Sequence, residues 1–284
     1  MPDVPRGLSA YIRLRSGRTN MKRILILALA TLGIPLSAQP AAVEDEEGLP
    51  PQAAIVRGVL VPVPRAIFQT LDRFADSNWR LVQRPELAHW RPPGAQAQNA
   101  LLLGAVIAEG FVAVEAKDSE ETKEIGRAVL KLARSLGVEK AALRRSRSII
   151  EHAESSDWPG LRREWNGVLP DVQQGMNELR SEDVAQLVSL GGWLRGTQAL
   201  AALISQTRSA RAAELLRQPA LLNYFEKQLA EMNRGLKSDP VVARMDEGLR
   251  HVRQALGPGD APISPNQVKE IARVSGELLD SLNR

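Results

Sequence analysis

Two charged residues lie in stretches that are otherwise almost entirely apolar, and they are the strongest candidates for chemistry. Glu109 directly follows the run at 101–108, and Arg195 directly follows the run at 190–194. A buried carboxylate is costly unless it is protonated or paired, and a buried guanidinium needs a partner for the same reason. We therefore predict that Glu109 and Arg195 form an ion pair between two central helices.

Glycines accompany both charges and favour close helix packing. The glycines expected to let two backbones approach are Gly104, Gly110, Gly192 and Gly196. The pair at 191–192 lacks the preceding strand and the Lys-Ser/Thr of a phosphate loop, so we interpret it as packing too. For the Glu109–Arg195 pair, the favoured interpretation is an ion pair that fixes helix register. The alternative is a ligand or catalytic site with Trp193 in its wall.

The histidines do not predict a metal site. His89, His152 and His251 lie far apart and form no His-x-x-x-His pair. Glu86 and Glu247 precede His89 and His251 by three and four residues, which places each pair on one helix face. A bundle-type di-metal site needs Glu-x-x-His on two helices, and the sequence has it once. We expect ordinary charge pairs, no metal and no cofactor. No Gly-x-Ser-x-Gly is present either.

Tryptophan and arginine side chains gather near residue 85. Trp79 and Trp90 flank a stretch that contains Arg80, Arg84 and His89. Such a group could hold a sugar or a peptide by stacking. The interpretation that we favour is that the rings close one end of a helical bundle.

A second basic cluster offers a possible contact with an anionic surface such as lipid headgroups. Its members are Arg144, Arg145 and Arg147, with Arg162 and Arg163 as possible additions. The favoured interpretation is a solvated helix face.

Helical periodicity accounts for most of the chain from residue 64 onward. Apolar residues in 119–136 recur at offsets of 0, 3, 4, 7, 8 and 11, which is one face of a helix. Other helices are expected over 65–75, 96–116, 139–154, 157–179 and 182–206, and from Pro219, Pro240 and Pro265. The helix at 139–154 should bury Leu143, Ile150 and Ala153. Residues 79–95 are rich in proline and should be mostly loop or short helix.

The predicted fold class is all-α, an antiparallel helical bundle of about eight helices joined by short loops. Residues 100–114 and 184–204 are apolar almost all round, and a helix of that kind is a buried one. We therefore place these two at the centre, within a helical domain at 64–284. Residues 39–63 are expected to be a flexible tether followed by a single extended segment at 53–61.

Residues 1–38 have the order of a secretion signal, and the true start is predicted at Met21. Lys22 and Arg23 precede an apolar run at 24–36, and cleavage is expected after Ala38. The run is too short to span a bilayer, and no later segment is a convincing transmembrane helix. The chain has no cysteine, which excludes lipid anchoring and thiolate metal sites.

The net charge of +4 belongs to this leader. Residues 1–38 carry six arginines and lysines against one acid, so the remainder has a formal charge of about −1. A net basic surface for nucleic acid is therefore not expected.

The sequence thus predicts an exported protein, periplasmic or secreted, that acts in binding or scaffolding in the bacterial cell envelope. An enzyme is not expected. The alternative is a small-ligand carrier or an enzyme with a pocket around Glu109 and Arg195. The partner would be a protein or a small ligand, and the sequence names neither.

Overall fold

The structure is a computed structural model that describes residues 53–56, 59–62, 70–89, 95–259 and 261–283, with side chains from residue 70 onward. The predicted secretion signal at 1–38, including its cleavage site at Ala38, lies outside the described residues. So do the tether at 39–52 and residues 65–69 of the helix predicted at 65–75.

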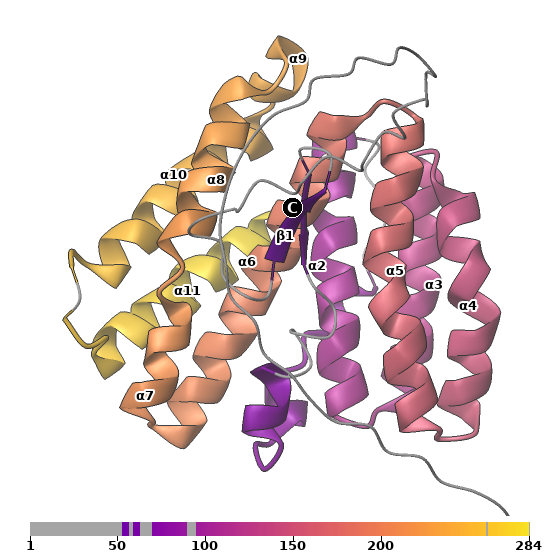
Figure 1. The fold of residues 1–284 in the computed structure, drawn as a ribbon, viewed down its shortest axis with the longest axis horizontal. Helices are drawn as coiled ribbons and strands as arrows, with labels where there is room; N and C mark the ends of the chain where they lie inside the picture. The colour runs from indigo at the N-terminus through magenta and orange to yellow at the C-terminus, as the bar shows by residue number, and fades with distance from the viewer. Residues whose placement is uncertain (1–52, 57–58, 63–69, 90–94, 260, 284) are drawn as a thin grey trace, which may run out of the picture. The chain divides into compact units, whose positions relative to one another are not determined.

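Most described residues are helical, as the sequence predicts (Figure 1). The long helices are α2 (Gln96–Glu115), α3 (Ser119–Ser135), α4 (Glu139–Glu154), α5 (Trp158–Glu178), α6 (Glu182–Thr207), α8 (Pro219–Glu231), α10 (Pro240–Leu256) and α11 (Pro265–Ser281). The short ones are α7 (Ala210–Ala213) and α9 (Arg234–Lys237). The described residues also form 3-10 turns at Asp72–Phe74, Trp79–Leu81, Pro85–Leu87 and Glu214–Leu216.

Side chains at the helix starts explain why the helices begin where they do. Asp118, Asp157 and Asp239 accept hydrogen bonds from the first free backbone N–H groups of α3, α5 and α10. Ser264 and Gln267 form a capping box at the start of α11. Polar capping residues therefore define where these four long helices begin.

Residues in the left-handed backbone region end several helices. Lys117, Arg180 and Arg208 have φ between 51° and 54°, at the ends of α2, α5 and α6. This conformation is costly without glycine, but a cation at a helix C-terminus is stabilised by the helix dipole. Gly137 adopts the same region after α3 with φ of 79°, where the absence of a side chain removes the steric cost.

The segment expected as a single extended stretch at 53–61 is instead a hairpin. Strand β1 (Ala53–Val56) pairs antiparallel with β2 (Val59–Pro62), with Val56 opposite Val59. Each short apolar run therefore serves as the partner strand of the other along one edge. Strand β2 lies against α5 and α6.

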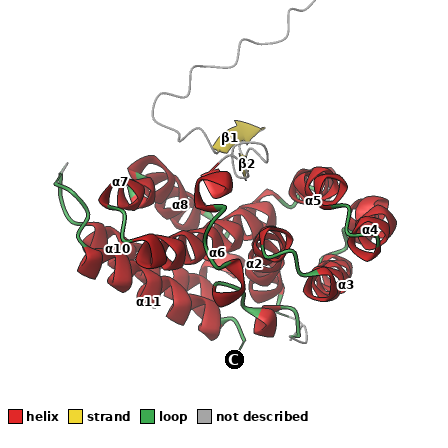
Figure 2. Ribbon diagram, turned by 90° about the horizontal axis from the view of Figure 1, so that it is seen from below, coloured by secondary structure: helices red, strands yellow, loops and turns green. Residues whose placement is uncertain are grey.

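The two helices predicted as central, α2 and α6, form the most extensive helix–helix contact in the structure. Helices α3, α4 and α5 follow α2 in a ring of neighbours seen end-on in Figure 2, and α11 covers α6 on the other side. Helix α2 has the length and apolar composition of a membrane span, yet 89% of that window is buried within the protein. Among the described residues it is the one helix with that composition, and its burial is that of a core helix.

The apolar face of α4 is rotated from the one predicted. Leu143 is 48% exposed and Ile150 is half-buried, whereas Ile149 and Ala153 are buried. The helix packs on α3 and α5 through the smaller Ala141 and Ala142, which brings residue 149 rather than 150 into the core.

Backbone contact at two glycines fixes how α2 crosses α6. A methyl carbon at Gly104 would lie 1.8 Å from Val188 O, and one at Gly191 would lie 1.9 Å from Leu101 O. Further along, Glu109 meets Arg195, so the contacts advance in the same direction and the two helices run parallel. No side chain larger than hydrogen fits at either crossing position.

We expect Gly104→Ala and Gly191→Ala each to lower the free energy of unfolding by roughly 3 kcal/mol or more, because the added methyl must push two backbones apart. Gly196→Ala is the matched control on α6, since its methyl would meet nothing within 4 Å. It should raise stability by about 0.5–1 kcal/mol through helix propensity. Urea denaturation measures all three, and equal effects at the three positions would contradict this crossing.

Candidate functional site

The predicted ion pair between the central helices is present. Arg195 Nη2 lies 2.5 Å from Glu109 Oε2, and Arg195 Nε donates a hydrogen bond of 2.6 Å to the same oxygen. Both side chains have no solvent exposure. Helix α2 supplies the carboxylate and α6 the guanidinium. Each charge therefore offsets part of the desolvation cost of the other.

The pair also holds a third part of the chain. Arg195 Nη2 donates to Val82 O at 2.6 Å, and Arg195 Nη1 donates to Gln198 Oε1 at 2.7 Å. The backbone N–H of Arg84 donates to Glu109 Oε1 at 2.7 Å. The loop between the 3-10 turns at 79–81 and 85–87 is therefore tied to both central helices through one buried salt bridge.

Burial dominates the electrostatics of this pair. It raises the pKa of the Glu109 carboxyl above its usual range, while the Arg195 guanidinium and the Arg84 N–H oppose that rise. Burial likewise lowers the pKa of Arg195, against the opposing effect of Glu109. Each group depends on its partner for its charge, which is the pattern of a structural pair with a high desolvation cost.

We expect Glu109→Leu to lower the free energy of unfolding by about 3–5 kcal/mol, because it leaves a buried arginine without its acceptor. The double variant Glu109→Leu/Arg195→Met should recover most of that loss, since two apolar side chains of similar size remove both charges together. Denaturant titration of Glu109→Leu, Arg195→Met, the double variant and the parent chain gives the comparison. A double variant as unstable as the sum of the two single variants would contradict the pairing.

The single variant Arg195→Met should behave differently with pH. Without the guanidinium the pKa of Glu109 rises further above its usual value of 4.5. The folded state then binds more protons than the unfolded state, so stability is present below about pH 4.5 and is lost as pH rises through the folded pKa. Glu109→Leu has no carboxyl and should lack this dependence. Thermal melts of both variants relative to the parent chain between pH 4.5 and pH 8 measure it, and parallel curves would contradict the expectation.

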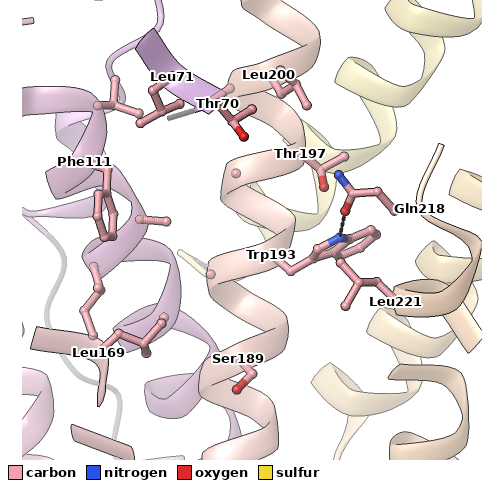
Figure 3. Close-up of a pocket in the computed structure, with 17 residues that line it drawn as sticks. Thr70, Leu71, Phe111, Leu169, Ser189, Trp193, Thr197, Leu200, Gln218 and Leu221 are labelled. Carbon is pink, nitrogen blue, oxygen red and sulfur yellow. Dashed lines mark hydrogen bonds between the residues drawn. The ribbon is translucent and has the colours of Figure 1, made fainter. Parts of the chain in front are cut away.

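A pocket of about 160 Å³ opens on another side of α6 (Figure 3). Helices α2, α5, α6 and α8 form its walls with residues 70–71. Apolar side chains dominate the lining and include Phe111, Leu169, Trp193, Leu200 and Leu221. Gly196 of α6 borders this space and is itself exposed, and a methyl group at that position would have no neighbour within 4 Å.

Most polar groups at the pocket are already engaged. Trp193 Nε1 donates to Gln218 Oε1 at 2.9 Å, and the Gln218 amide donates to Leu215 O. Ser189 Oγ donates to Ala185 O and accepts from Gln173. Among the described residues the Thr197 hydroxyl has no hydrogen-bond partner, so it is the polar group left for a ligand.

The structure separates the residues that the sequence groups into one site. Trp193 lines the pocket, but Glu109 and Arg195 do not. Residues 193 and 195 stand about 200° apart around a helix, so they face different neighbours. Phe111, Thr197 and Gln218 were not singled out from the sequence, because nothing in their spacing distinguishes a pocket wall from a core face.

The predicted packing glycines have three different roles. Gly104 and Gly192 lie at the crossing of α2 and α6, and both also border the pocket. Gly110 contacts the ring of Trp165 on α5 rather than α6, and a methyl group there would lie 1.7 Å from the ring. Gly196 packs against nothing and borders the pocket, so its prediction as a packing residue is wrong.

The tryptophan and arginine group near residue 85 is structural where it is described. Trp79 is buried and donates from Nε1 to Phe74 O, so its ring is not open to a sugar. Arg80 pairs with Asp118, and Arg84 pairs with Glu86 and Asp280. His89 contacts Pro85 O through Nδ1. Trp90 lies outside the described residues.

The remaining candidates are charge pairs. His152 pairs with Asp157, and no cluster of three or more possible metal ligands occurs in the part of the chain that the structure describes. Carboxylates also offset much of the predicted basic cluster. Arg144 and Arg145 pair with Asp171, and Arg162 pairs with Asp72 and Glu115.

Comparison with known proteins identifies no relative. No family model, no curated protein and no solved structure matches this chain.

Proposed function

We propose that this is an exported, non-enzymatic binding protein whose apolar pocket holds one aromatic ring or short alkyl group of a small ligand. The observation that carries the proposal is the pocket of about 160 Å³ between α2, α5, α6 and α8, with the Thr197 hydroxyl as the polar group that has no partner among the described residues. Apolar walls with few polar groups are typical of small-molecule sites.

The size of the pocket limits what can enter. An apolar protein cavity of roughly 150 Å³ holds one benzene molecule, whereas pockets for drug-sized ligands measure about 300–1,000 Å³. The pocket therefore matches a ring or a chain of about six carbons, with any larger part of the ligand outside. A hydroxyl on that group could bond to Thr197, which lies one turn beyond Trp193 on α6 (Figure 3).

The surroundings of the Glu109–Arg195 pair support a structural role rather than a catalytic one. Both side chains are fully buried, and their hydrogen bonds go to Val82, Gln198 and Arg84 of the same chain. A general acid or base must come within hydrogen-bond reach of its substrate, and nothing in this arrangement offers that reach. The signal-like order of residues 1–38 supports export, and it is the only support for a place in the cell envelope.

Straight-chain alcohols test the pocket. The full chain is expressed in a bacterium, recovered from the periplasmic fraction and titrated with 1-butanol, 1-hexanol and 1-decanol by calorimetry. Each added CH₂ should tighten binding about fourfold until the chain reaches about six carbons, after which the gain should fall. Gly196→Leu should weaken 1-hexanol binding at least about tenfold because its side chain enters the pocket.

Gly196→Ala is the control, because one methyl removes far less of the pocket and leaves α6 intact. Equal binding by the parent chain and Gly196→Leu would contradict the proposed pocket. Mass spectrometry of the chain from the periplasmic and the cytoplasmic fractions tests export separately. An N-terminus at Gln39 in the periplasmic fraction is expected, and a chain found in the cytoplasm with residues 1–38 attached would contradict export alone.

A further inference from the structure

A second groove, of about 450 Å³, lies where the C-terminal end of α6 meets α7 and the 3-10 turn at 72–74. Its lining includes Arg73, Phe74, Thr207, Ser209, Arg211 and Leu215. The groove shares no lining residue with the apolar pocket. Two arginines from segments far apart in the sequence therefore border one hollow.

These two arginines differ from most arginines on the described surface. Arg73 and Arg211 are exposed, and neither forms an ion pair or a side-chain hydrogen bond with the described residues. Their acidic sequence neighbours are engaged elsewhere: Asp72 pairs with Arg162, and Glu214 pairs with Arg217 and accepts from the Ile263 N–H. Asp76, three residues after Arg73, makes no ion pair with a described residue either. The N–H donors of both guanidinium groups are therefore not used by any described residue and are available to a ligand.

A hydroxyl donor completes the groove. Ser209 Oγ accepts a hydrogen bond from the Ala212 N–H at 3.1 Å, so its own proton remains available. Thr207 Oγ1 donates to Ile204 O and has no proton to offer. The groove thus presents two cations and one neutral donor, and its described polar side chains include no carboxylate.

We propose that Arg73, Arg211 and Ser209 bind a phosphate-type oxyanion. Guanidinium groups present planar pairs of N–H donors that match the oxygens of phosphate, and hydrogen bonds between charged partners are about twice as strong as neutral ones. A bound anion supplies the negatively charged partner that these two arginines lack within the described part of the chain. The oxyanion comes either from a free phosphate compound or from a phospholipid headgroup.

Two titrations of the full chain test the site and distinguish the sources. Inorganic phosphate is titrated by calorimetry at low ionic strength, and flotation measures binding to vesicles of phosphatidylglycerol with phosphatidylcholine vesicles as reference. Binding to either phosphate source supports the site. Binding in the calorimetric titration indicates a free phosphate compound, and binding in the flotation experiment indicates a phospholipid headgroup. The double variant Arg73→Gln/Arg211→Gln should bind at least about tenfold more weakly, because each lost contact is a charge-assisted one.

The charge-matched control is Arg147→Gln/Arg244→Gln, which removes two other exposed arginines that have no ion pair with a described residue. It should bind as the parent chain does. Equal weakening in both double variants would show a general charge effect and overturn the site, as would the absence of saturable binding to both phosphate sources. Melting temperatures of the two variants should match that of the parent chain, since neither pair of arginines has a partner to lose among the described residues.

Discussion

The buried salt bridge between Glu109 and Arg195 is the interaction on which the arrangement of the central helices depends. Two apolar helices can slide or rotate past each other with little change in apolar burial, because dispersion contacts are not directional. A buried ion pair removes that freedom, since any shift that separates the charges leaves both unpaired. The same pair binds Val82 O and the Arg84 N–H, so it also places the loop that precedes α2.

Register fixed in this way explains both the tight and the open parts of the interface. Gly104 and Gly191 allow the backbones of α2 and α6 to touch, and Trp165 fills the place of a side chain at Gly110. Past the crossing the helices need side chains to fill the space between them. At Gly196 there is none, and the pocket lies there. The same two helices are therefore in backbone contact at one level and border an open pocket at another.

The sequence predicts the helices and the salt bridge because both follow from local patterns. Proline and aspartate mark the starts of α5 and α10, and a charge inside an apolar helix must find a partner of opposite sign. The hairpin is not predicted from the sequence, although Arg57-Gly58 separates two apolar runs, because 53–61 is interpreted as one segment that has no visible partner strand elsewhere in the chain. The pocket and the arginine groove depend on which segments meet in space, and no spacing along the chain indicates that Thr197 borders a pocket or that Arg73 and Arg211 border one groove.

The separation of Trp193 from Arg195 has a consequence for how such a protein can acquire binding properties. One face of α6 carries the charge that fixes the helix, and another face carries the wall of the pocket. Substitutions at Thr197, Leu200 or Leu221 change the shape and polarity of the pocket without touching the salt bridge. The pair supplies a rigid support, and rigid supports keep a site in place while its lining varies. The ion pair and the pocket lie on different faces of α6. The lining of the pocket can therefore change while the buried ion pair stays intact.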